Sequence, residues 1–268
     1  VGNSVSVAVP TTVAGNYTYT LVSVQESGSG TCSNSASGAV SATIQSLPSA
    51  TISGTTQVCV NSASPVVQFS AAGGQSPYTF SYRINGGAVQ TISSGPGNVA
   101  SIPVPTQTAG AFVYSLVSVQ EAGSCIASAS GNATITVHEL PTASITGSAT
   151  VCHNTASPVI VFSASAGIAP YVFSYRVNGG SEQTITTVNG SSVSLVVPTS
   201  VAGDYVYELV RVQESGIAAC TNAASGSVTV RVQPLPGGNI SGDAVVCRNA
   251  SSPLIQFSGT GGTAPYTF

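Results

Sequence analysis

The sequence predicts an all-β protein made of tandem repeats of about 93–95 residues that form an elongated rod. The first observation behind this is a period, because two sets of three cysteines recur at steps of 93 and 95 residues: 59, 152, 247 and 32, 125, 220. The second is that whole phrases return. The phrase SPVVQFSAAGGQSPYTFSYRINGG at 64–87 is answered by SPVIVFSASAGIAPYVFSYRVNGG at 157–180. The third is that apolar residues alternate with polar ones, and no stretch has helical periodicity.

The period divides the chain into four parts. Residues 48–140 and 141–235 are complete repeats, residues 1–47 are the C-terminal half of a preceding repeat, and residues 236–268 are the N-terminal third of a following one. About 93 residues suffice for a self-sufficient hydrophobic core. We therefore expect each complete repeat to fold alone, and we interpret the chain as part of a longer array.

Within one repeat, apolar and polar residues alternate as they do in half-buried strands. In 65–72, Val67, Phe69 and Ala71 share one face, and Val66 and Gln68 lie on the other. The segment 78–84 alternates in the same way, with aromatic residues on one face. Both segments recur in the next repeat at 158–165 and 171–177. These are strand signals.

The turns complete the pattern. Asn-Gly-Gly at 85–87 and 178–180 supplies the positive-φ residues of a tight hairpin. Further strands are expected at 99–104, 111–120 and 133–137, and at their counterparts 193–197, 205–213 and 228–232. About seven short strands in such a repeat indicate an immunoglobulin-like sandwich of two antiparallel sheets. Five tyrosines near the penultimate strand either include a tyrosine-corner residue or, as we favour, are ordinary core aromatics: Tyr17, Tyr19, Tyr114, Tyr205 and Tyr207.

The repeats join directly through Leu-Pro at 47–48, 140–141 and 235–236, with no Gly/Ser linker. Proline restrains the residue before it to extended conformations. We therefore expect a semi-rigid rod in which each repeat contacts its neighbours and adds roughly 40 Å.

Charge is sparse, and this excludes several classes of partner. Charged residues make up 5% of the chain, there is no lysine, and the net charge is −3. A basic surface for nucleic acid or for anionic lipid is therefore not expected. No apolar run is long enough to cross a bilayer, so membrane insertion is not expected either. The Ser/Thr-rich, lysine-free composition is typical of exported surface proteins.

Six cysteines at fixed places favour disulfides formed in an oxidising compartment. Pairing within a repeat would join Cys59 to Cys125 and Cys152 to Cys220, leaving Cys32 and Cys247 with partners outside the fragment. Pairing across a junction would instead join cysteines 27 residues apart: 32 to 59, 125 to 152 and 220 to 247. We favour the first arrangement because a bond inside its own core benefits each repeat most.

No residues group into a catalytic, cofactor-binding or metal-binding motif. The eight acids are scattered, and only Glu26, Glu121 and Glu214 recur, which we interpret as solvated turn residues. His138 and His153 are not repeated in neighbouring repeats. Arg83 and Arg176 do recur, on an outward strand face. We therefore expect no enzyme activity and no cofactor.

Several phrases together carry a family resemblance: LPTASITG at 140–147, AGDYVY at 202–207 and TAPYTF at 263–268. With the two cysteines of each repeat, they resemble the tandem immunoglobulin-like repeats of giant Bacteroidota surface proteins, closest to the SprB-type gliding adhesins. The repeats here are longer than the compact repeat of that type.

The resemblance implies type IX secretion, attachment at the outer membrane and a cell-surface filament. Such a filament would contact external surfaces or polysaccharide and would be moved by separate gliding and secretion machinery. The alternative is a spacer stalk that presents an enzyme or carbohydrate-binding domain of a secreted polysaccharide-degrading protein. A carbohydrate-binding module in its own right ranks third, because the recurrent aromatic residues fall on the expected inward faces.

Overall fold

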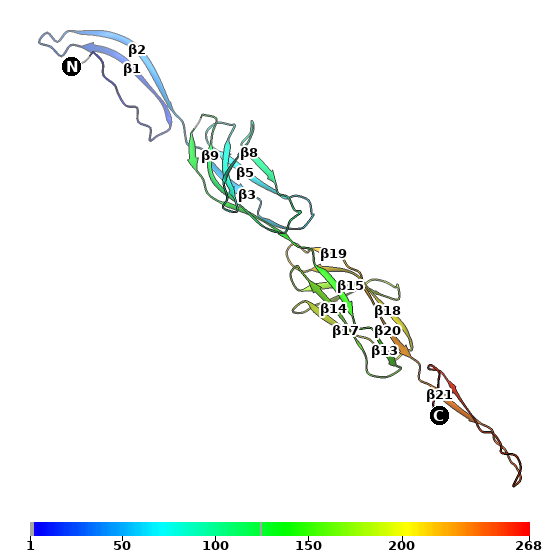
Figure 1. The fold of residues 1–268 in the computed structure, drawn as a ribbon. Helices are drawn as coiled ribbons and strands as arrows, with labels where there is room; N and C mark the ends of the chain where they lie inside the picture. Colours follow the sequence, from blue (N-terminus) through cyan, green and yellow to red (C-terminus); the bar gives the residue numbers. More distant parts are fainter. Residues whose placement is uncertain (1–2, 124) are drawn as a thin grey trace. The chain divides into compact units, whose positions relative to one another are not determined.

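The computed structural model describes residues 3–123 and 125–268, and this part of the chain contains strands and no helix (Figure 1). Its contacts divide it into two compact units. Unit 1 is Val1–Thr56 with Ala63–Thr136, and unit 2 is Gln57–Ser62 with Val137–Phe268. The all-β class expected from the sequence is confirmed.

Unit 1 contains a hairpin and a sandwich of two sheets. The hairpin pairs β1 (Gly15–Gln25) with β2 (Ser33–Ile44) in antiparallel fashion. One sheet has the order β3-β5-β8, which are Ser49–Ser53, Val66–Ala72 and Val99–Pro103. The other has the order β4-β11-β9-β6-β7, which are Thr56–Cys59, Asn132–His138, Gly110–Gln120, Thr79–Ile84 and Val89–Ser93, and β10 (Ile126–Ser128) pairs with β9. The last residues of β4 and β11 belong to unit 2.

Unit 2 repeats this topology. Its smaller sheet has the order β12-β14-β17: Thr142–Thr146, Val159–Ser165 and Ser192–Val196. Its larger sheet has the order β13-β20-β18-β15-β16: Ala149–Cys152, Ser227–Gln233, Gly203–Glu214, Tyr171–Val177 and Gln183–Thr186. Here β19 (Thr221–Ala223) pairs with β18. A last antiparallel pair joins β21 (Gly237–Ser241) to β22 (Gln256–Thr260).

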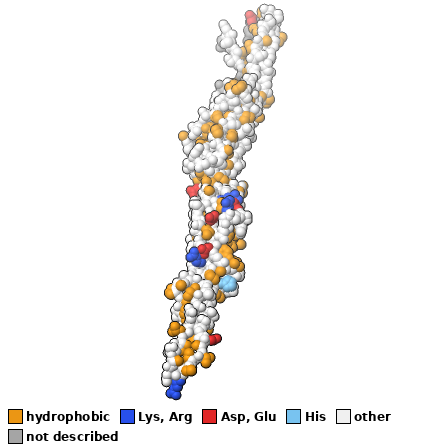
Figure 2. All heavy atoms as spheres, turned by 90° about the vertical axis from the view of Figure 1, so that its right-hand side faces the viewer, with side chains coloured by type: hydrophobic (Ala, Val, Ile, Leu, Met, Phe, Trp, Pro, Cys, Tyr) orange, Lys and Arg blue, Asp and Glu red, His pale blue; other side chains and the backbone are white. Residues whose placement is uncertain are grey.

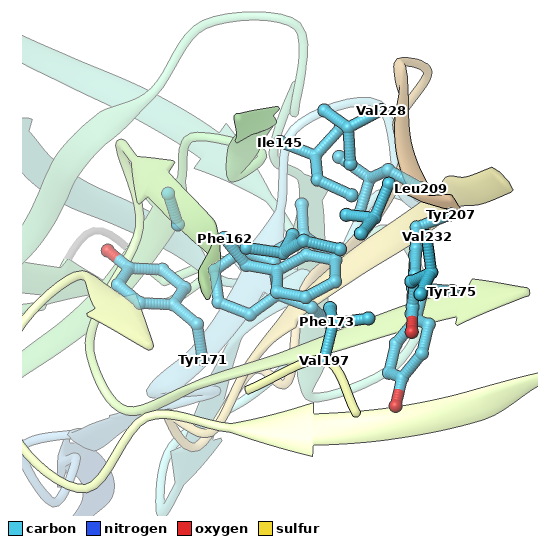
Figure 3. Packing of buried hydrophobic residues seen from close by; sticks show 14 residues of the cluster. Ile145, Phe162, Tyr171, Phe173, Tyr175, Val197, Tyr207, Leu209, Val228 and Val232 are labelled. Carbon is cyan, nitrogen blue, oxygen red and sulfur yellow. The ribbon is translucent and has the colours of Figure 1, made fainter. Parts of the chain in front are cut away.

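Each sandwich closes over an aromatic core that lies on the strand faces expected from the alternation. Val67 and Phe69 are fully buried, whereas Val66, the first residue of β5, is exposed on the other face. In unit 2 the rings of Phe162 and Phe173 lie at the centre of the core, with centroids 5.7 Å apart (Figure 3). The corresponding separation between Phe69 and Phe80 in unit 1 is 5.6 Å. The two cores therefore place the same pair of phenylalanines at corresponding positions.

The predicted Asn-Gly hairpins are confirmed. Asn85 and Asn178 both have φ of 50°, and the glycines that follow have φ of 71° and 69°. Each Asn also fixes the strand beyond it, because its Oδ1 accepts a hydrogen bond from the backbone N–H of Val113 at 2.8 Å or of Val206 at 2.7 Å. The side chain thus ties the hairpin to the neighbouring strand.

Four of the five tyrosines near the penultimate strand take the two expected roles, and Tyr19, which is 36% exposed, takes neither. Tyr17 and Tyr205 donate their hydroxyl hydrogen bonds to the carbonyls of Val13 and Val201 four residues upstream, both at 3.0 Å. This is the geometry of a tyrosine corner. Tyr207 is a core residue instead, and burial raises the pKa of its hydroxyl.

Candidate functional site

The structure joins Cys59 to Cys220 in a disulfide, across a sequence separation of 161 residues and with Cα atoms 5.6 Å apart. Among the described residues, Cys32, Cys125, Cys152 and Cys247 are free thiols. The structure therefore contains neither Cys59–Cys125 nor Cys152–Cys220, and none of the 27-residue pairings. Both arrangements that the sequence left open differ from it.

Strand direction explains the correction. In unit 2, β13 runs parallel to β20 and places Cys152 beside Gln233, at the C-terminal end of β20. Strand β18 runs antiparallel to β20, and its first residue, Gly203, pairs with Val232 at that same end. Cys220 follows the other end of the 12-residue strand β18, roughly 40 Å away at ~3.4 Å per residue. A disulfide requires Cα atoms within about 7 Å, so the two cysteines of one repeat cannot meet.

The sequence led us to expect that the recurrent glutamates are solvated turn residues. In the two sandwiches this expectation is wrong. Glu214 is 0% exposed and Glu121 is 3% exposed, whereas Glu26 is exposed. The Glu214 Oε2 atom accepts a hydrogen bond from the backbone N–H of Ile168 at 2.7 Å, and Glu121 accepts one from Gln75. Glu121 thus holds the loop between β5 and β6 against the end of β9, and Glu214 holds the loop between β14 and β15 against the end of β18.

Close glycines make room for these carboxylates. A Cβ on Gly167, whose φ is +72°, would lie 2.6 Å from Glu214 Oε2, and one on Gly74 would also collide with Glu121. The backbone is therefore shaped around the side chain, since both a positive φ and a missing Cβ are needed at these positions. The recurring Gly and Glu therefore act together, because the glycine leaves the space that the buried carboxylate occupies.

Replacing Glu214 by alanine is expected to lower the free energy of unfolding by about 1–3 kcal/mol, because a fully buried side chain is removed and the backbone N–H of Ile168 loses its acceptor. Glu214→Gln should cost less, since an amide oxygen can still accept that hydrogen bond. The matched control is Glu208→Ala, an exposed glutamate on the same strand. Urea denaturation measures all three, and equal losses for Glu208→Ala and Glu214→Ala would contradict the clamp.

Glu121 also acts on its neighbouring thiol. A hydrogen bond with the Glu121 carboxylate raises the pKa of Cys125, and partial desolvation and the negative charge of Glu121 add to this. The Cys125 Sγ atom also lies 3.6 Å from Gln45 Oε1. The raised pKa favours the protonated thiol of Cys125 over the thiolate.

The charged residues form a few surface pairs. Glu182 contacts Arg211 at 2.6 Å and Arg176 at 3.9 Å. Arg83 donates to the Gly87 carbonyl at 3.0 Å, so both recurrent arginines lie on the outer surface as expected. Figure 2 shows how few charged side chains occupy the face it presents.

The two histidines make local contacts. His138 Nε2 lies 2.7 Å from Gln57 Oε1, and His153 Nε2 lies 2.8 Å from the Ser200 carbonyl oxygen. These contacts tie strand ends and loops together.

Acid should weaken unit 2 through its bidentate pair. Arg231 Nε and Nη2 donate to the two Asp204 carboxylate oxygens, both at 2.8 Å, and these hydrogen bonds hold the pKa of Asp204 below its usual value. A lowered native pKa gives stability that is present above the unfolded pKa, near 4, and is lost as the pH falls through the native value. Asp204→Asn should therefore flatten the acid limb of a stability-versus-pH curve. An unchanged slope below about pH 4 would contradict this.

Within residues 3–123 and 125–268, no group of three or more His, Cys, Asp or Glu side chains could hold a metal ion. The same part of the chain has no helix of the length and hydrophobicity needed to span a bilayer. The chemistry that the described side chains do show is disulfide formation and hydrogen-bonded clamping of loops.

Comparison with known proteins shows the fold. The I67–I69 fragment of the titin I-band matches with a TM-score of 0.50 and 13% identity, covering 80% of this chain and 76% of that one. At this identity the similarity extends to the fold alone, an array of immunoglobulin-like sandwiches. No protein-family model and no curated protein sequence matches the chain.

Two further matches fall below the TM-score at which a shared fold is inferred. A 1.5-MDa bacterial ice-binding adhesin gives 0.41, with 17% identity over 79% of this chain and 74% of that one. The fibronectin(III)-like modules of Clostridium thermocellum CbhA give 0.33, with 14% identity over 69% and 94%.

Proposed function

We propose that the chain is the repeat region of a long, non-catalytic adhesin filament at the cell surface, and that it mediates surface attachment in gliding motility. The observation that carries the proposal is the faithful repetition of one sandwich. Strand order, core phenylalanines, Asn-Gly hairpins and buried glutamates all return from one repeat to the next. A chain that repeats its packing residues in this way is suited to reach and valency.

The proposal includes the repeat boundaries at 48, 141 and 236 and an elongated rod of stacked repeats. It also includes an extracellular location with outer-membrane attachment through parts beyond these residues. The partners are external surfaces or polysaccharide together with gliding and secretion machinery. The resemblance of LPTASITG and TAPYTF to gliding-adhesin repeats supports this choice. Many weak contacts along such an array would add through effective concentration.

Latex beads coated with antibody against the chain test the proposal on living cells that make it. Beads that bind and travel along the cell are the expected result. Beads that bind and stay in place would overturn the motility role and favour a fixed adhesin or an enzyme-bearing stalk. Beads that do not bind intact cells, although the antibody detects the protein in lysed cells, would overturn the surface location.

A further inference from the structure

The disulfide crosses the repeat period. Cys59 is the first cysteine of the repeat at 48–140, and Cys220 is the second cysteine of the repeat at 141–235. We propose that this bond is one rung of a ladder, in which the first cysteine of each repeat is linked to the second cysteine of the next. The ladder would take the force on the array away from the sandwiches between its rungs.

All six cysteines lie in the two backbone settings that form this bond. The carbonyls of the first cysteines, Cys59, Cys152 and Cys247, each accept from the N–H three residues later, at 3.1, 3.2 and 3.1 Å. The carbonyls of the second cysteines, Cys32, Cys125 and Cys220, each accept from the N–H of the recurrent glutamate, at 2.9, 3.1 and 3.0 Å. The four free cysteines therefore share the backbone hydrogen bonds of the two bonded ones.

The surroundings of Cys152 support the same pairing, of a first cysteine with the second cysteine of the following repeat. Cys152 opens on a hollow lined by Gln233, Gly262 and Pro265, among others. By the period, the last two correspond to Gly167 and Pro170, in the loop that Glu214 holds beside Cys220. The loop of a following repeat thus lies next to a first cysteine here, where the proposed bond requires it.

The chemistry of each rung is an ordinary thiol oxidation. Two thiols lose two protons and two electrons and form one S–S bond. The electrons pass to the disulfide of a thiol–disulfide oxidoreductase, which becomes a dithiol. Such exchange belongs to an oxidising compartment, in agreement with an exported protein.

Pairing the first cysteine of each repeat with the second cysteine of the next has a mechanical consequence. The loop closed by Cys59 and Cys220 contains Cys125 and Cys152, whose own bonds would leave it in opposite directions along the array. Two interleaved covalent paths result. They run through 27-residue segments, 32–59 and 220–247 on one path and 125–152 on the other. Each path can lengthen only by stretching its short segments, so the oxidised array is about sevenfold less extensible than the free chain.

A peptide map of the chain, produced under oxidising conditions and digested without reductant, tests the register. Trypsin has few sites, because the chain has five arginines and no lysine. The proposal predicts that peptide 1–83 is linked to peptide 212–231. A link between 84–176 and either of these peptides would overturn it, because the proposal gives Cys125 and Cys152 no partner on them. In the same map of protein from its own cells, peptide 84–176 should carry no internal Cys125–Cys152 bond and peptide 1–83 no internal Cys32–Cys59 bond.

Single-molecule stretching from the two ends tests the mechanical part. In the oxidised chain, the segment between Cys59 and Cys220 should not extend. Reductant or Cys59→Ser should release its 161-residue separation, which adds roughly 530–580 Å of contour length. Cys32→Ser, which removes an exposed free thiol outside the loop, should leave the oxidised trace unchanged. Equal extension of the oxidised wild type and Cys59→Ser would overturn the proposal.

Discussion

Replacing Cys59 by serine is expected to lower the free energy of unfolding by about 5 kcal/mol. The bond closes a loop across 161 residues, and chain-entropy arguments give this magnitude for the freedom that such a loop removes from the unfolded chain. The substitution also leaves Cys220, which is 1% exposed, without its covalent partner. The bond is therefore worth as much as a large part of the stability of a typical domain.

Urea denaturation of the oxidised proteins measures this difference, and reduction gives an internal check. Wild type in reductant should unfold at the urea concentration at which Cys59→Ser unfolds without it. The matched control is Cys152→Ser, which changes a first cysteine that is exposed and unpaired. If Cys59→Ser and Cys152→Ser unfold together with the oxidised wild type, the bond contributes nothing to stability.

The fold could be predicted because its signals are local. The alternation through Phe69 and Phe173 and the Asn-Gly pairs at 85 and 178 each depend on residues close in sequence. The same signals recur a full period later, so a strand or turn predicted in one repeat is supported by the same pattern in the next. Strand faces and hairpins accordingly appear in the structure where they were expected.

The cysteine pairing could not be read in this way because it depends on strand direction. Spacing alone leaves the pairing open, but in the structure Cys152 lies at the end of β13, parallel to β20, and Cys220 lies beyond the opposite end of β18. Only the sheet order shows that cysteines of one repeat are a strand length apart. An explicit trace of the immunoglobulin-like topology, in which the first strand crosses to pair with the last, is the signal that would have excluded pairing within a repeat.

The buried glutamates were missed for a different reason. A Glu at a strand end is typical of solvent-exposed turns, and Glu26 fits that description. The overlooked signal is the recurrence of Gly74 and Gly167, since the glycine and the glutamate contact each other across the sandwich end. A recurring charge paired with a recurring glycine indicates a buried clamp better than either residue does alone.

Alanine substitutions of two equivalent phenylalanines should show whether the repeats fold independently. Phe80 and Phe173 are both 0% exposed and occupy corresponding positions in units 1 and 2. Truncating a buried phenylalanine removes its transfer free energy and leaves a cavity, which together cost about 3–5 kcal/mol. Each change should therefore destabilise its own sandwich strongly, and by a similar amount, because the ring contacts are nearly identical.

Thermal unfolding in reductant distinguishes repeats that unfold separately from repeats that unfold as one cooperative body. In reductant, Phe80→Ala should lower the midpoint of one thermal transition and Phe173→Ala that of another, because each core holds its own sandwich together. Val188 is an exposed loop residue, so Val188→Ala is the control and should move neither midpoint. If either phenylalanine change moves all of the unfolding to one lower temperature, the repeats unfold as a single cooperative body. The boundary at 141 would then be a feature of the sequence and not of folding.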